Sequence, residues 1–227
     1  MNKKNIKIDT RKVVGIAVFS ALAFVLSLVI RFPVMFLTFD VKDAIICTSA
    51  FIYGPIAAPI VALLTALLEL ITNISGTGLY GFLMNFLSSA ALSTVASLVY
   101  RKWRTLNGAI VSMLAAVIAM VAVMMGANLL ITPYYMTGGS VAAVAELIPS
   151  VLLPFNLAKG LLNAAITLLI YKPIKIAMKR AGLLSKEKAT GKTLAEEFRF
   201  TRSTGVILVC AVFMIALSVI LFYTLLH

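Results

Sequence analysis

The sequence predicts an all-α polytopic membrane protein, and three observations support this fold class. Hydrophobic residues make up 62% of the 227 residues, above the roughly 45–50% that is usual in soluble domains. The mean hydropathy is +1.06. Several apolar segments also reach the length of roughly 18 residues at which a helix can cross a hydrocarbon core about 30 Å thick. A soluble fold could not bury so much apolar surface, so we expect these segments to be membrane-spanning helices.

Seven spans are predicted from the apolar segments, taken in chain order. The first follows a basic N-terminal stretch and ends before Pro33, because proline disfavours helical backbone in the residue that precedes it. A polar connection follows. A single helix over residues 44–72 would be about 44 Å long, so we expect two short spans joined by the turn GPIAAP. The spans cover residues 13–30, two parts of 44–72, 81–100, 107–131, 150–171 and 204–226.

The basic residues predict on which side of the membrane each loop lies. With a cytoplasmic N-terminus, 17 of the 20 Lys and Arg residues fall in cytoplasmic segments, as the positive-inside rule requires. Counting residues 44–72 as one helix would place Arg101, Lys102 and Arg104 outside. The same distribution accounts for the net charge of +12, so we expect a lipid bilayer and no nucleic-acid partner.

A polar stretch after Arg180 divides the chain into three parts. We expect a six-span membrane domain over residues 1–182, a cytoplasmic polar linker over 183–203 and a C-terminal transmembrane helix over 204–227.

Catalytic signatures are absent from the sequence. The single histidine is His227, which excludes HExxH, and there is no DDxxD, no GxSxG and no Walker-type GxxxxGK[ST]. Cys47 and Cys210 lie in apolar segments without CxxC spacing, so neither a disulfide nor a metal site is predicted. Energy for uphill transport would have to come from an ion gradient or from another subunit.

Ionisable side chains at membrane depth are candidates for function, because a charge in lipid costs several kcal/mol. The members of this group are Asp40, Lys42, Asp43, Glu69 and Lys159. The alternative is that the lysines extend to the lipid headgroups and that the acids pair with them.

Polar side chains also gather at the outer ends of the predicted spans. Asn85, Asn128 and Asn156 lie there together with Asp40 and Lys159, so we expect one outward-facing pocket. For any single asparagine, a hydrogen bond between helices is the alternative.

The sixth span and the nearby aromatic residues add to this pocket. Asn156, Lys159 and Asn163 are spaced i, i+3, i+7 and should share one helix face. Flat apolar surface is supplied by Phe36, Phe39, Tyr80, Phe82, Tyr134, Tyr135 and Phe155. Such a pocket suits a flat amphipathic molecule.

Five segments resemble the substrate-binding S-components of bacterial energy-coupling factor (ECF) transporters, and within them the riboflavin-specific group. They are FLTFDVKD (36–43), FIYGPIAAPI (51–60), GFLMNFLSS (81–89), ANLLITPYY (127–135) and LPFNLAKG (153–160). The resemblance covers about residues 12–182. It implies a six-helix S-component bundle in the bacterial cytoplasmic membrane, with a vitamin site near the outer face, to which this chain adds the C-terminal transmembrane helix.

The resemblance also implies roles for individual residues. Asn128, Asn156 and Lys159 would contact the flavin, and the first outer loop, about Phe36 to Asp40, would close over it. The full set of expected ligand-binding residues is Leu37, Thr38, Phe39, Asp40, Asp43, Asn85, Asn128, Asn156 and Lys159.

One pair of small residues fits the family pattern, and two positions differ from it. Ala17 and Ala21, four residues apart on the first span, would dock against the shared coupling subunit. Lys42 stands where the family pattern has a small polar residue, and GFLMN lacks an acid that the pattern has.

The predicted function is therefore that of a high-affinity riboflavin-binding subunit of an ATP-driven ECF-type vitamin importer. A transmembrane coupling subunit and two ATPase subunits would power it, and riboflavin would be its transported ligand, with no cofactor. Three alternatives stay open: an S-component for another vitamin such as pantothenate, whose carboxylate Lys159 could hold; an intramembrane enzyme using Asp40, Asp43 and Glu69; and a self-sufficient secondary transporter with an ion site at Glu69.

Overall fold

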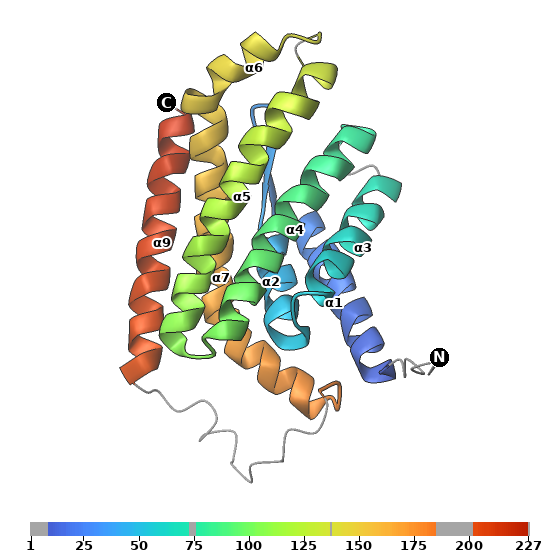
Figure 1. Ribbon diagram of the computed structural model, residues 1–227, viewed down its shortest axis with the longest axis vertical. Coiled ribbons are helices and arrows are strands. Elements are labelled where there is room, and N and C mark those ends of the chain that lie inside the picture. The colour runs from blue at the N-terminus through green and yellow to red at the C-terminus, as the bar shows by residue number, and fades with distance from the viewer. Residues whose placement is uncertain (1–8, 73–75, 137, 185–201, 227) are drawn as a thin grey trace, which may run out of the picture.

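The computed structural model describes residues 9–72, 76–136, 138–184 and 202–226, and these residues form a bundle of long helices (Figure 1). The elements, in chain order, are α1 (Thr10–Val29), β1 (Arg31–Val34), β2 (Leu37–Asp40), α2 (Lys42–Tyr53), α3 (Ala57–Ile71), α4 (Gly78–Lys102), α5 (Leu106–Tyr135), α6 (Val141–Leu147), a π-helix (Ile148–Leu152), α7 (Leu153–Arg180) and α9 (Arg202–Leu226). The start of α1 and the end of α9 lie at opposite ends of the bundle (Figure 1). The fold is all-α apart from one short hairpin, as predicted.

Five helical segments of the described residues are long and apolar enough to cross a membrane. They are α1, α4, α5, the segment from Val141 to Arg180, and α9. The predicted seven spans correspond to these five together with the shorter α2 and α3. The chain is therefore a multi-pass membrane protein.

Residues 44–72 divide into two helices at Gly54, as the sequence predicted. Gly54 has a φ of +92°, which glycine adopts without the steric cost that a side chain would bring. The helices on either side contain 12 and 15 residues, or about 18 and 23 Å at 1.5 Å per residue. The shorter helix, α2, packs against α1, α3, α4 and α7, so it lies inside the bundle.

Several predicted boundaries were wrong. The connection after the first span is an antiparallel hairpin in which Arg31 pairs with Asp40 and Val34 with Leu37. Helices α5 and α7 continue through Pro133 and Pro173, which membrane helices tolerate because neighbouring groups satisfy the freed backbone carbonyls. Helix α6 was not predicted, and the predicted span over residues 150–171 begins inside the π-helix.

The C-terminal helix α9 lies alongside α7 (Figure 1). The Ser218 hydroxyl donates to the Ala158 carbonyl oxygen at 2.8 Å, and Phe222 packs against Phe39 with ring centroids 5.4 Å apart. The extra helix therefore contacts both the body of the bundle and the hairpin. The predicted linker (183–203) falls largely outside the described residues.

Candidate ligand-binding site

A cavity of about 80 Å³ lies where the hairpin meets α4, α5 and α7. Its lining residues are Phe36, Leu37, Thr38, Thr77, Gly81, Met84, Asn85, Ser88, Met124, Asn128, Tyr135, Phe155, Asn156 and Lys159. Six of the nine expected ligand-binding residues are among them. The structure therefore brings together polar side chains that are far apart in the sequence.

Three asparagine amides of this cavity are held in a defined orientation. Nδ2 of Asn156 donates to the Leu152 carbonyl oxygen at 2.8 Å, and Nδ2 of Asn128 donates to the Met124 carbonyl oxygen at 2.7 Å. Nδ2 of Asn85 donates to Glu69 Oε2 at 2.9 Å. Because a carbonyl or a carboxylate can only accept, each contact fixes which end of the amide is the NH₂ group.

At Asn85 and Asn156 these contacts use one N–H of the amide and leave the amide oxygen available as an acceptor. Asn128 differs, because its Oδ1 already accepts from the Thr132 hydroxyl at 2.9 Å. Thr132 was not expected from the sequence, although it follows Asn128 by four positions on the same helix face.

Lys159 adds a cation to the cavity, and buried carboxylates surround it. Its Nζ lies 3.1 Å from Asp40 Oδ2 and 3.9 Å from Asp43 Oδ2. The Ser89 hydroxyl donates to Asp43 Oδ1. Asp40 and Asp43 do not line this cavity; they lie behind Lys159 and are almost fully buried.

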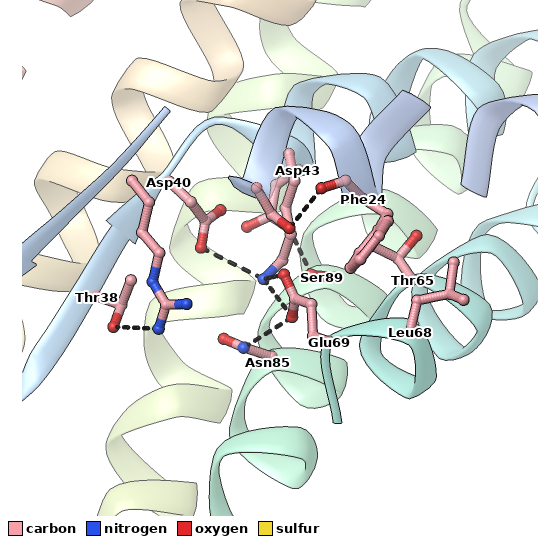
Figure 2. A network of polar contacts seen from close by, with 12 residues as sticks. Phe24, Thr38, Asp40, Asp43, Thr65, Leu68, Glu69, Asn85 and Ser89 are labelled. Carbon is pink, nitrogen blue, oxygen red and sulfur yellow. Dashed lines mark hydrogen bonds and ion pairs between the residues drawn. The ribbon is translucent and has the colours of Figure 1, made fainter. Parts of the chain in front are cut away.

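A second lysine, Lys42, connects Asp40 to Glu69, and Glu69 in turn contacts a residue of the cavity wall. Lys42 Nζ lies 3.3 Å from Asp40 Oδ2 and 2.7 Å from Glu69 Oε1. Glu69 in turn accepts from Asn85. Figure 2 shows Asp40, Asp43, Glu69, Asn85 and Ser89 gathered from β2, α2, α3 and α4 into one cluster.

The network begins and ends at residues that line the cavity, namely Lys159 and Asn85. Three carboxylates and two ammonium groups take part in it, and each of these five residues is at most 5% exposed. The lysines therefore pair with acids inside the bundle, whereas the alternative of extension to the lipid headgroups would expose them.

Asn163 does not belong to the cavity lining, contrary to the prediction. Its Oδ1 accepts from the Ala44 backbone N–H at 2.9 Å, and its Nδ2 donates to the Asp40 carbonyl oxygen at 3.0 Å. Val41, the N-cap residue of α2, provides no side-chain hydrogen bond. Asn163 therefore replaces a local cap at the start of α2.

Phe39 also lies outside the cavity. It is buried edge-on against Phe155 and Phe222, on the side of the hairpin that faces α9. Of the other aromatic residues expected near the pocket, Tyr80 stacks on the lining residue Tyr135 with centroids 5.5 Å apart. Phe82 stacks on Phe86 instead, and Tyr134 is 72% exposed.

Comparison with known proteins identifies the family. The family model of the ECF transporter, substrate-specific component, matches residues 11–171. The chain belongs to this family. It is therefore a component of a bacterial membrane transporter and not an enzyme.

The S-component is similar to two named transporters and to a solved structure, each over most of its length. It is 30% identical to the riboflavin transporter RibU of Staphylococcus aureus (strain TCH60) over 76% of this chain and 94% of the relative. It is 29% identical to the riboflavin transporter FmnP of Bacillus subtilis (strain 168), over 73% of this chain and 92% of the relative. A solved S component of a bacterial ECF transporter superimposes with a TM-score of 0.64, at 28% identity over 76% of this chain and 100% of that one.

Helix α9 lies beyond the part of the S-component that the family model matches, because the match ends at residue 171. The family core and the cavity residues fall inside the match. Ser88 also lines the cavity and was missed, although it follows Asn85 by three positions on one helix face. Its buried hydroxyl has no hydrogen-bond partner among the described residues.

Proposed function

We propose that this S-component binds riboflavin in the cavity beneath the hairpin and supplies it to an ECF-type importer. The observation that carries the proposal is the convergence of Asn85, Asn128, Asn156 and Lys159 on one cavity, in a chain whose named relatives are riboflavin transporters. A transmembrane coupling subunit and two ATPase subunits would provide the energy.

The hydrogen-bonding groups of the cavity suit a flavin. An isoalloxazine ring carries one N–H donor between two carbonyl acceptors, and its ribityl chain carries hydroxyl groups. The oxygens of Asn85 and Asn156 can accept from such donors, and Lys159 can donate to a carbonyl oxygen. Phe36, Tyr135 and Phe155 provide aromatic surface for the ring.

The charges around Lys159 favour a neutral ligand over a carboxylate such as pantothenate. Lys159 already faces the carboxylates of Asp40 and Asp43, and the whole network has one more carboxylate than ammonium groups. A ligand carboxylate would add a further negative charge in a place where water cannot screen it. Riboflavin has no charged group and avoids this cost.

The size of the cavity requires movement of its walls when the vitamin binds. Its volume of about 80 Å³ is below the roughly 300 Å³ at which ligand pockets begin. Of the lining residues, Phe36 to Thr38 belong to a two-stranded hairpin and Thr77 directly precedes α4, whereas the others lie in packed helices. We infer that the hairpin tip moves outward to admit riboflavin and closes over it.

The surface of α1 is suited to the expected contact with the coupling subunit. Ala17 and Ala21 lie on the exposed face of α1, where small side chains permit close approach of another helix.

The proposal is tested by titrating the purified full-length protein with riboflavin and following the flavin fluorescence. We expect saturable quenching, which excess pantothenate does not reverse. Absence of quenching together with saturable pantothenate binding would reject riboflavin as the ligand. Uptake by vesicles that contain this chain but no ATPase subunit would instead support the self-sufficient transporter.

A further inference from the structure

A second and larger cavity is lined by residues at the start of α1. The start of α1 lies at the opposite end of the bundle from the hairpin (Figure 1). The volume of this cavity is about 640 Å³, well within the range of roughly 300–1,000 Å³ for small-molecule sites. Its walls come from the start of α1, the turn between α2 and α3, the ends of α4 and α7, and the residues after α7. The proposed function assigns no role to this cavity.

The charged groups of this cavity are mostly cationic. Among the described residues that line it, Lys12, Arg101, Arg104 and Lys175 carry a positive charge and Asp9 carries the one carboxylate. The Asp9 carboxylate is already used at the start of α1, where its Oδ1 accepts from the Arg11 backbone N–H at 3.1 Å. The cavity therefore has an excess of positive charge.

The inner wall is aromatic and carries hydroxyl groups. Phe51 contacts both Tyr100 and Tyr171, with ring centroids 4.5 and 5.4 Å apart. The two tyrosine hydroxyls lie 3.5 Å from each other. Ser97 also lines the cavity, and its buried hydroxyl has no hydrogen-bond partner among the described residues.

Helix α3 begins beside the cavity without a side-chain cap. Gly54, Pro55 and Ile56 line the cavity, and α3 follows at Ala57 with no capping hydrogen bond and no acidic residue in its first turn. The first N–H of α3, at Ala57, already donates to the Gly54 carbonyl oxygen at 3.1 Å, and the third residue, Pro59, has no N–H. The start of α3 therefore contributes the positive end of its dipole to this side of the cavity, and the side chains contribute the hydrogen-bond donors.

We propose that this cavity binds a phosphate-bearing anion. Arginine matches the geometry of phosphate oxygens, and basic pockets between helices at the cytoplasmic membrane surface bind anionic lipid headgroups. The tyrosine and serine hydroxyls supply further donors, and the aromatic wall supplies surface for the apolar part of the ligand. The phosphate belongs either to a lipid headgroup or to a soluble aromatic phosphate, and the two sources can be distinguished by experiment.

The experiment uses delipidated full-length protein in neutral detergent and two probes. Phosphatidylglycerol is compared with phosphatidylcholine by native mass spectrometry, and phenyl phosphate is titrated by calorimetry. We expect at least one anionic probe to bind, with an affinity that falls as salt is added. Binding of phosphatidylglycerol alone identifies a lipid site, and binding of phenyl phosphate identifies a site for soluble phosphates.

Matched variants decide whether the cavity is responsible. Arg101→Gln with Arg104→Gln should weaken binding roughly tenfold or more, because hydrogen bonds to charged groups are lost. Lys102→Gln with Lys172→Gln removes the same charge from exposed neighbours outside the lining and should have little effect. Lys12→Gln with Lys175→Gln tests the same wall if the arginine variant does not fold.

The proposal concerns only the far end of the bundle, so riboflavin quenching should be unchanged in all of these variants. Two results would overturn it: neither probe binds the parent protein, or the cavity pair and the control pair weaken binding equally. The second result would mean that only the general surface charge attracts the anion.

Discussion

Lys42 Nζ lies 2.7 Å from Glu69 Oε1 and joins the start of α2 to α3 in the interior of the bundle. Both side chains are buried. Glu69 also accepts from the amide of Asn85, which lines the ligand cavity. The ion pair therefore connects two helices of the bundle and orients a residue of the proposed binding site.

Replacing Lys42 by Met should destabilise the protein strongly. The change leaves Glu69 and Asp40 with less compensating charge in a buried place, where breaking a pair costs about 3–5 kcal/mol. A lower melting temperature in detergent would measure the loss. The double change Lys42→Met with Glu69→Met should recover part of it, since neither charge then stays buried alone, and Lys102→Met, at an exposed position, should leave the melting temperature unchanged. A Lys42→Met protein that melts like the parent would contradict the buried pair.

Asn163→Ala should mainly lower the stability of the folded protein, and its effect on the affinity for riboflavin should be smaller. The change removes the Asn163 partner of the Asp40 carbonyl oxygen and leaves the Ala44 N–H with its longer contact to the Val41 carbonyl oxygen, at 3.3 Å. The loss of these buried hydrogen bonds should cost about 1–3 kcal/mol. The melting temperature of the ligand-free protein measures this effect. Asn156→Ala is the comparison, because the Asn156 amide donates to the Leu152 carbonyl oxygen, four residues earlier in the same continuous helical segment. Equal melting temperatures for the two variants would contradict the capping role.

The hairpin turn should tolerate glycine better than valine at position 35. Met35 has a φ of +54° and is 66% exposed, so its side chain packs little while its backbone occupies the left-handed region. That region costs a side-chain-bearing residue roughly 1–2 kcal/mol, and a β-branched residue is the least suited to it. We expect Met35→Gly to melt at or above the parent and Met35→Val below it. The reverse order would show that the turn has another conformation in solution.

Gly160 should be required for the close packing of α7 on α5. A Cβ atom there would lie 2.8 Å from a Met120 methyl carbon and 3.0 Å from a Val117 methyl carbon, so Gly160→Leu should overpack the interface at a cost of about 1–3 kcal/mol. Gly126→Leu provides the control, because nothing lies within 4 Å of a Cβ at that position. In thermal denaturation, Gly160→Leu should melt at a lower temperature than the parent, and Gly126→Leu should melt like the parent. If both leucine variants melt alike, α5 and α7 are not in the contact described.

The sequence predicted those features that depend on local chemistry. Apolar length and charge indicated the helices, and Gly54 with Pro55 indicated the break between α2 and α3. The spacing of Asn156 and Lys159 placed both on the cavity wall.

Features that depend on distant partners were not predictable in this way. Asn163 has the same helical spacing as Asn156 and Lys159, yet it contacts the start of α2, 119 positions earlier in the chain. The hairpin strands are four residues long and one contains Pro33, so they show no clear alternating pattern. Lys42 was recognised as a departure from the family pattern, but its partner Glu69 could be found only from the packing of α2 on α3.

The affinity of Asn156→Ala for riboflavin, measured by fluorescence quenching, tests the central claim most directly. Loss of the amide that faces the ligand should weaken binding by about 1–3 kcal/mol, or roughly five- to 150-fold, while the melting temperature of the ligand-free protein stays near that of the parent. Lys159→Ala is a less direct test, because Lys159 also neutralises Asp40 and its loss should reduce stability as well. Unchanged riboflavin affinity in a folded Asn156→Ala protein would contradict the proposed site.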